Sequence, residues 1–179
     1  MNHTSDYNRL RMLRAVTDDE ILIRVALNVR MMKTLSRYGT KRLSEKLGIT
    51  PIYLDTIQYG KQTTPVSLGV KICQVLKITP NMIFTDDFFM ESETDKSFLY
   101  HTFDHRDIGK RCKYFREEQD LSLQDLSDRL KKANYPMSAN RLQKIEEGKE
   151  TLTLVVFERL LKIFDVDPNT FFYEELEGE

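Results

Sequence analysis

The histidines at positions 101 and 105 are the side chains of this sequence that come nearest to a metal-binding pattern. They are four residues apart beside Asp104 and Asp107, a spacing that metal ligands can have. A single pair next to an acidic segment is more typical of surface histidines, because the chain has only three histidines and no cysteine nearby. The sequence contains no phosphate-binding glycine loop, no Ser-His-Asp pattern and no cysteine pair with zinc spacing. We therefore expect neither an enzyme nor a bound metal or cofactor.

The stretch of residues 43–61 reads as two short helices joined by a tight turn. Leu43 and Leu47 are one helical turn apart, so they can share a buried face. Gly48 suits the left-handed conformation that often ends a helix. Thr50 is suited to cap the helix that follows, because its hydroxyl can accept a hydrogen bond from a backbone N–H that the helix start leaves free.

The second helix of this stretch begins at Pro51, where a missing backbone N–H costs nothing, and Gly60 ends it. Leu54 and Ile57 give it an apolar stripe. Two helices packed across so short a turn leave the outer face of the second one exposed. This is a helix-turn-helix arrangement, in which the second helix can enter the major groove of DNA.

These residues carry a resemblance to a known family. The run Leu-Ser-Glu-Lys-Leu-Gly-Ile-Thr at 43–50, with Leu54 and the run Ile-Gln-Tyr-Gly-Lys at 57–61, resembles the helix-turn-helix family of lambda repressor and Cro, often called the XRE family. The resemblance extends from the helix before this stretch to Phe84. It implies a small helical domain that binds DNA through the second helix of the motif, the recognition helix.

A second copy of the pattern begins at Leu121. Seven positions match, since Leu43, Leu47, Thr50, Leu54, Ile57, Gly60 and Lys61 correspond to Leu126, Leu130, Ser138, Leu142, Ile145, Gly148 and Lys149. Pro80 and Pro168 each follow the matched glycine by 20 positions, and a phenylalanine follows each proline by four. The chain is thus similar to two XRE-type domains in tandem. We expect an all-α fold of two small five-helix lambda-repressor-like domains.

In this family the first turns of the recognition helix face the edges of the bases. The resemblance assigns these contacts in the second copy to Ala139, Asn140, Arg141 and Lys144, with Gln143 beside them. Asn can pair with adenine, Arg or Lys with guanine, and an Ala methyl can meet a thymine methyl. The first copy has Pro51, Ile52, Tyr53 and Thr56 at these places. They suit apolar contacts with thymine and a hydroxyl hydrogen bond to phosphate, so they specify less of the DNA sequence.

Four cations of the first copy could hold the phosphate backbone, a contact that positions a protein without specifying sequence. They are Lys41, Arg42, Lys46 and Lys61. The alternative for all of these side chains is that they are ordinary solvated residues on helix surfaces. The presence of two copies of the motif favours contact with DNA.

The two copies depart from the family pattern in different ways. The family ends its recognition helix with Ile-Glu-x-Gly, and the Glu pairs with an Arg of the first helix. In the second copy Glu146 and Arg116 have the matching spacing. The first copy has Gln58 with Lys33 roughly opposite, so a hydrogen bond could replace the ion pair there.

The second copy also has seven residues, 131–137, where the first has two, 48 and 49. Either the preceding helix runs a turn longer or the turn bulges toward DNA. Lys131 and Lys132 could then reach phosphate, or the bulge could block docking.

Composition and charge limit the classes of protein to which the chain can belong. The 179 residues, 40% hydrophobic and 31% charged, suffice for two small globular domains. No apolar run approaches the ~20 residues of a membrane span, and no secretory signal is visible. Cys73 and Cys112 fall in expected helices and should be reduced and mostly buried, with a bridge or a metal site as the alternative. We expect a cytoplasmic protein.

The charge is unevenly distributed. Residues 1–90 contain 13 Lys and Arg against 8 Asp and Glu, whereas residues 91–179 contain 14 against 20. The first part suits phosphate contact. The acidic tail would repel DNA, so it should point away from DNA or meet a protein. Its acids are Asp165, Asp167, Glu174, Glu175, Glu177 and Glu179.

We expect three segments. An N-terminal XRE-type domain with a basic extension occupies 1–85, a partly ordered acidic and aromatic connector occupies 86–103, and a C-terminal XRE-type domain with an acidic tail occupies 104–179. Residues 7–16 form either an amphipathic helix on the first domain or a basic arm that follows a groove. The connector should pack on a domain or a second chain, because it is too rich in large apolar residues for a free linker. These are Phe88, Phe89, Met90, Phe98, Leu99 and Tyr100.

Helix limits follow from the same signals. We expect first helices at Ile21–Ser36 and Asp107–Gln119, and fourth helices at Val66–Leu76 and Leu152–Phe164. The buried face of the first of these should contain Ile21, Val25, Leu27, Met31, Met32 and Leu35. Thr17 to Glu20 is a typical helix start, with a capping residue followed by acids.

Taken together, the sequence predicts a bacterial or phage transcriptional regulator, a repressor that binds double-stranded DNA sequence-specifically. One chain could span a two-part site with unlike half-sites, whereas a homodimer would read a longer palindrome. The alternative is an antirepressor or inhibitor that uses one or both helix-turn-helix domains to bind a regulatory protein or to dimerise. The acidic second copy and its inserted residues favour this alternative, while Asn140, Arg141 and Lys144 speak against it.

Overall fold

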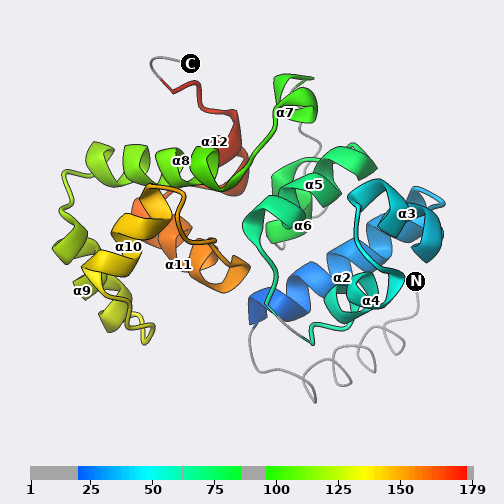
Figure 1. The fold of residues 1–179 in the computed structure, drawn as a ribbon, viewed down its shortest axis with the longest axis horizontal. Coiled ribbons are helices and arrows are strands. Elements are labelled where there is room, and N and C mark those ends of the chain that lie inside the picture. Colours follow the sequence, from blue (N-terminus) through cyan, green and yellow to red (C-terminus); the bar gives the residue numbers. More distant parts are fainter. Residues whose placement is uncertain (1–19, 62, 86–95, 177–179) are drawn as a thin grey trace.

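The computed structural model describes residues 20–61, 63–85 and 96–176, and within them the chain forms eleven helices and no strand (Figure 1). The all-α fold class is therefore confirmed. The helices are α2 (Glu20–Leu35), α3 (Thr40–Leu47), α4 (Pro51–Gln58), α5 (Val66–Leu76), α6 (Pro80–Phe84), α7 (Lys96–Tyr100), α8 (His105–Glu118), α9 (Leu123–Lys132), α10 (Ala139–Glu146), α11 (Leu154–Phe164) and α12 (Pro168–Tyr173). The extension at 7–16, the expected helix start at 17–19, and Phe88, Phe89 and Met90 lie outside the described residues.

The two helices expected to be recognition helices, α4 and α10, begin at the expected hydroxyl caps. The Thr50 hydroxyl accepts a hydrogen bond from the backbone N–H of Tyr53 at 3.1 Å, and the Ser138 hydroxyl accepts one from Arg141 at 3.3 Å. Gly48 adopts φ 71°, the left-handed conformation that ends α3. The caps satisfy backbone donors that a helix start leaves free, so they determine where each recognition helix begins.

Helix α8 begins at His105 rather than at the expected Asp107, because Asp104 caps it. The Asp104 carboxylate accepts hydrogen bonds from the backbone N–H groups of Arg106 at 2.7 Å and Asp107 at 3.1 Å. These backbone donors, Asp107 foremost, lower the pKa of Asp104. Helix α11 begins at Leu154, two residues after the expected Leu152, because the Leu152 carbonyl bonds to another segment of the chain.

The buried residues of helix α2 are predicted only in part. Ile21, Val25 and Met32 are buried as expected, and Leu27 and Met31 are half-buried. Leu35 is 65% exposed, so its prediction as a buried residue is wrong, and Ile23, Ala26 and Val29 are buried in addition. Helix α2 contacts α4, α5 and α6, and also α11 from far along the chain. Because it is covered on more than one face, a single apolar stripe could not identify its buried residues.

We call α2–α6 (residues 20–85) the first half and α8–α12 (residues 104–176) the second half. The two halves meet through contacts that are made twice with the partners exchanged. The backbone N–H of Val66 donates to the Leu152 carbonyl at 3.0 Å, and that of Leu154 donates to the Thr64 carbonyl at 2.9 Å. Val66 and Leu154 are 88 residues apart, as are Thr64 and Leu152. We call the contact between the two halves, of which these residues are a part, the junction.

A second reciprocal pair lies at the starts of α6 and α12. The backbone N–H of Asn81 donates to the side-chain oxygen of Asn169 at 3.0 Å, and the backbone N–H of Asn169 donates to that of Asn81 at 2.9 Å. These residues are also 88 positions apart. Corresponding positions of the two halves therefore face each other at two separate places.

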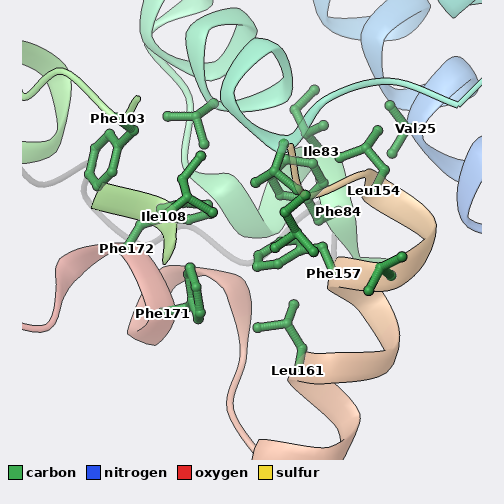
Figure 2. Packing of buried hydrophobic residues seen from close by; sticks show 14 of the residues in the cluster. Val25, Ile83, Phe84, Phe103, Ile108, Leu154, Phe157, Leu161, Phe171 and Phe172 are labelled. Atoms are coloured by element: carbon green, nitrogen blue, oxygen red, sulfur yellow. The ribbon is translucent and has the colours of Figure 1, made fainter. Parts of the chain in front are cut away.

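Aromatic rings from both halves fill the junction (Figure 2). The centroid of the Phe84 ring lies 5.6 Å from that of Phe157 and 6.4 Å from that of Phe172. All three side chains are at most 3% exposed. They belong to one buried cluster that runs from α2 to α12, so the two halves share a single hydrophobic core.

The described end of the connector packs on both halves. Phe98 in α7 is 1% exposed, and its ring centroid lies 6.1 Å from that of Phe172. The Gln74 side chain of α5 donates hydrogen bonds to the carbonyls of Phe98 at 2.7 Å and His101 at 2.8 Å. The expectation that the connector packs on the protein is confirmed for this part, although Tyr100 is 87% exposed.

Candidate nucleic-acid interface

Helix α10 has one buried face and one face in solvent. Leu142 and Ile145 are each 2% exposed and hold the helix against α8 and α9. The residues expected to contact bases lie together outside this buried stripe, with Ala139 half-buried and Asn140, Arg141, Gln143 and Lys144 exposed. The structure thus brings the whole expected set of the second half onto one helix surface.

A buried ion pair sets the position of α10 on α8. The guanidinium group of Arg116 donates from Nε to Oε1 of Glu146 at 2.7 Å and from Nη2 to Oε2 at 3.0 Å, which confirms the pair expected from the spacing. The side chains are 10% and 8% exposed. Arg116 also donates to the Leu121 carbonyl at 2.7 Å, and the hydrogen bond with Glu146 raises the pKa of Arg116. This forked geometry holds the recognition helix in one orientation.

Gly109 permits the close crossing of α8 and α10, a role that no sequence motif marks. A Cβ atom at position 109 would lie 2.4 Å from the backbone oxygen of Ile145 and 2.7 Å from that of Glu146. Backbone atoms in a helix cannot move aside as a flexible side chain can. The available signal was its position one turn before Cys112 on the apolar face of the first helix.

Gly109→Ala should lower the free energy of unfolding by about 1–3 kcal/mol, the usual cost of forcing extra volume into a packed site. The substitution raises intrinsic helix propensity, so a loss of stability must come from crowding where α8 and α10 cross. Urea unfolding followed by circular dichroism measures it. Lys110→Ala is the control, because Lys110 is exposed on the same helix and its replacement adds no volume at the crossing. Equal stability of the two variants would contradict the prediction.

The long polar side chains of α10 are engaged by acids that follow the helix. Arg141 forms an ion pair with Glu150. The Gln143 side chain donates to Glu147 at 2.8 Å, and Lys149 lies 2.6 Å from the same carboxylate. Hydrogen bonds from Lys149 and Gln143 lower the pKa of Glu147. A nucleic acid would have to replace these acids as partners of Arg141 and Gln143.

Helix α4 of the first half presents a different surface. Ile52 is 77% exposed, Pro51 is exposed, and Tyr53 is half-buried. The half-buried Thr56 donates its hydroxyl to the Tyr53 carbonyl at 2.7 Å, so a bond from Thr56 to phosphate would require this one to break. The surface can make apolar contacts and has few donors for base edges.

Gln58 does not take the partner suggested by the sequence. Its side-chain amide donates to the Leu54 carbonyl at 3.3 Å and to the Asp55 carboxylate at 3.1 Å. The ammonium group of Lys33 bonds to the Thr40 hydroxyl at 3.0 Å instead. A hydrogen bond within α4 thus replaces the interhelical one expected with Lys33, because the amide of Gln58 is buried within reach of its own helix.

Cations gather around tyrosines on the first half. Lys41, Arg42, Lys46 and Lys61 are all exposed, as contact with phosphate requires. Lys61 and Arg30 lie 5.5 and 5.3 Å from the centroid of the Tyr59 ring, and Tyr59 is 47% exposed. The sequence gives no sign that Arg30 and Tyr59 meet, because Arg30 comes from α2 and only packing brings it there.

The inserted residues of the second half lengthen α9 and then close the turn. Leu130 matches the last residue of α3, and α9 continues to Lys132. Asn134 takes φ 58°, and Met137 is 4% exposed. The Ser127 hydroxyl donates to the Met137 carbonyl at 2.6 Å and ties the turn to α9. The helix therefore gains two residues rather than a full turn, and Lys131 and Lys132 are exposed.

The two candidate metal ligands, His101 and His105, have different partners in the fold. His101 lies 3.5 Å from the Asp107 carboxylate, and His105 lies 3.5 Å from the Thr151 hydroxyl. The described residues contain no group of three or more side chains that could hold a metal ion. Cys73 and Cys112 are free and buried, as expected, and burial raises the pKa of both thiols. Every helix in the described part of the chain is too short or too polar to span a bilayer.

The fold and the exposed surface of α10 define a helix-turn-helix domain. Residues 113–171 match the family model for helix-turn-helix, a span that begins inside α8 and ends inside α12. This match indicates a DNA-binding regulator of transcription. It covers less than half of the chain and lies within the second half. No curated protein and no solved structure matches the chain.

Proposed function

We propose that this chain is a sequence-specific repressor of transcription and that α10 is its principal reading helix. The observation that carries this proposal is the exposed set Asn140, Arg141 and Lys144 on a helix held by Arg116 and Glu146. Asn suits adenine, and Arg and Lys suit guanine. A rigidly held helix would present these donors to the major groove in one register.

The chain carries two XRE-type five-helix domains in tandem, with boundaries at 1–85 and 104–179 and a connector at 86–103. Equal backbone conformations at corresponding positions support this. Gly60 and Gly148 have φ 60° and 66°, and Lys77 and Asp165 both have φ 56°. Asn28 donates to the Ile83 carbonyl and Arg111 to the Phe171 carbonyl, both at 3.1 Å, and these two acceptors are also 88 residues apart.

The first domain contributes affinity more than sequence recognition. Lys41, Arg42, Lys46 and Lys61 contact phosphates, while Pro51, Ile52, Tyr53 and Thr56 lie toward the bases. Phosphate contacts position a protein on the duplex and base contacts specify the site. The partner is double-stranded DNA, the protein acts in the cytoplasm, and it is not an enzyme.

A protein-binding role is the second candidate. The exposed Ile52 side chain favours it, as do the acids Glu147 and Glu150 beside the reading residues. An antirepressor or inhibitor would use such a surface for a regulatory protein or for a second copy of the chain. This candidate predicts no base-dependent loss of binding when the reading residues are changed.

Arg141→Ala should weaken binding to the specific site by about 1–3 kcal/mol and leave binding to random duplex nearly unchanged. Arg141 is exposed and paired only at the surface, so stability should change little. Titration of labelled duplexes from the upstream region of its own gene, over a salt series, measures both affinities. Lys162→Ala on α11 is the control, since it also removes one exposed positive charge.

The salt series separates the two candidate functions. A DNA reader should bind one upstream fragment tightly and lose affinity steeply as salt rises, because phosphate contacts release counterions. Weak binding that is equal for every duplex and absent at physiological salt would contradict the repressor. The protein-binding role would then be tested by a pull-down.

A further inference from the structure

The reciprocal bonds at the junction reveal how the two halves are oriented. Val66 bonds to Leu152, and Leu154 bonds to Thr64. Val66 corresponds to Leu154 and Thr64 to Leu152, each 88 residues apart, so the second bond is the first with the two halves exchanged. Asn81 and Asn169 repeat this exchange. A contact between corresponding residues that is made twice with partners exchanged is the mark of a two-fold axis. If the two halves were instead related by a translation, one surface of the first half would contact a different surface of the second half.

The recognition helices follow the same relation. Helix α4 begins at Pro51 and α10 at Ala139, again 88 residues apart. In Figure 1 they lie toward opposite ends of the molecule, with α5 and α11 between them. Duplex DNA also has two-fold axes perpendicular to its own axis. Two recognition helices related by a two-fold axis therefore meet half-sites that run in opposite directions.

The junction surfaces of each half are already occupied by the other half. Phe84 and Phe172 are 3% and 2% exposed, and Leu154 is 1% exposed. A second chain could not use these surfaces unless the shared core opened. One chain thus has the internal symmetry that a dimeric reader obtains from two copies.

We propose that a single chain reads one DNA site composed of two unlike half-sites in inverted orientation. The inference rests on the proposed function and adds the architecture of the site. The half-site under α10 carries most of the sequence requirement, since Asn140, Arg141 and Lys144 stand where α4 has Ile52, Tyr53 and Thr56. The half-site under α4 tolerates more substitutions.

The orientation can be tested by making the two reading helices alike. The triple variant Ile52→Asn, Tyr53→Arg and Thr56→Lys gives α4 the three principal reading residues of α10, which are Asn140, Arg141 and Lys144. The half-site of α10 is first defined by selection from random duplexes with the unmodified chain. Duplexes then carry two copies of it about one helical turn apart, in inverted or in direct orientation. The triple variant should prefer the inverted duplex by about tenfold or more, and the unmodified chain should bind both alike.

A second measurement requires no redesign of α4. Glu45→Cys on α3 and Asp128→Cys on α9 lie at corresponding exposed positions outside the residues expected to contact DNA, while the natural Cys73 and Cys112 are buried and should not react. Each cysteine is coupled to an iron chelate that cleaves nearby DNA. The two probes should cut about one helical turn apart and on opposite strands. The mass of the complex should correspond to one chain per duplex.

The outcomes separate this inference from the proposed function. Cuts on the same strand, preference for the direct duplex, cuts from the Asp128→Cys probe alone, or two chains per duplex would each overturn the inverted single-chain site while specific binding remains. Selection that enriches no sequence would overturn the proposed function, and the inference with it. Opposite-strand cuts with one chain bound support both.

Discussion

Replacing Arg116 by alanine is expected to lower the free energy of unfolding by about 3–5 kcal/mol, because removing one member of a buried pair leaves the other charge unpaired. The Glu146 side chain is only 8% exposed and accepts both forked bonds from Arg116. The Leu121 carbonyl would lose its bond from the guanidinium group as well. Urea unfolding at pH 7 measures the loss.

Three further variants identify the cause. Arg116→Lys keeps the charge but cannot make the fork, so it should recover only part of the loss. The double variant Arg116→Met with Glu146→Leu removes both charges and should be much more stable than Arg116→Ala. Glu117→Ala is the control, because Glu117 touches the same arginine from a side chain that is 55% exposed. A loss as small as that of Glu117→Ala would show that Arg116 is not the support of α10.

Phe157→Ala should cost about 3–5 kcal/mol of unfolding free energy, as expected for deletion of a large side chain from a packed core. Phe157 is 1% exposed and lies among Phe84, Phe171 and Phe172, with ring centroids 5.6, 5.0 and 5.6 Å away. Because Phe84 belongs to the first half, the deletion should destabilise both halves. Thermal unfolding followed by calorimetry should show one transition at a lower temperature.

The number of transitions decides whether the core is shared. Leu35→Ala is the control, since Leu35 is 65% exposed and such substitutions usually change stability by less than about 0.5 kcal/mol. Two separated transitions, with only the second half shifted by Phe157→Ala, would contradict a shared core. Unchanged stability would contradict the burial of Phe157 itself.

Much of the second half could be predicted because its signals are local. Ser138 and Asp104 can cap a helix from their own sequence neighbourhood, although the expected start of α8 was two residues late. The pairing of Arg116 with Glu146 followed from family spacing, and the structure confirms it. The exposure of Asn140 and Lys144 followed from the period of the helix, which places Leu142 and Ile145 inside.

The errors occurred where distant segments meet. The sequence does not show that Ile145 backbone atoms approach position 109, so Gly109 passed unnoticed. The spacing suggests an interhelical hydrogen bond from Gln58 to Lys33, whereas the Gln58 amide bonds within its own helix. The ion pair between Arg141 and Glu150 depends on the path of the chain after α10, which no periodic pattern describes.

The sequence by itself determined the all-α class, the places where α4 and α10 start and the chemical difference between these two helices. These depend on caps, helical periodicity and residue type, which act within a few residues of the chain. Only the tertiary structure decided that the halves share one core and that they meet about a two-fold relation, in which Val66 bonds to Leu152 as Leu154 bonds to Thr64. Asn81 and Asn169 bond to each other in the same reciprocal way. A repeat in the sequence is compatible with several relative orientations, and long-range packing selects among them.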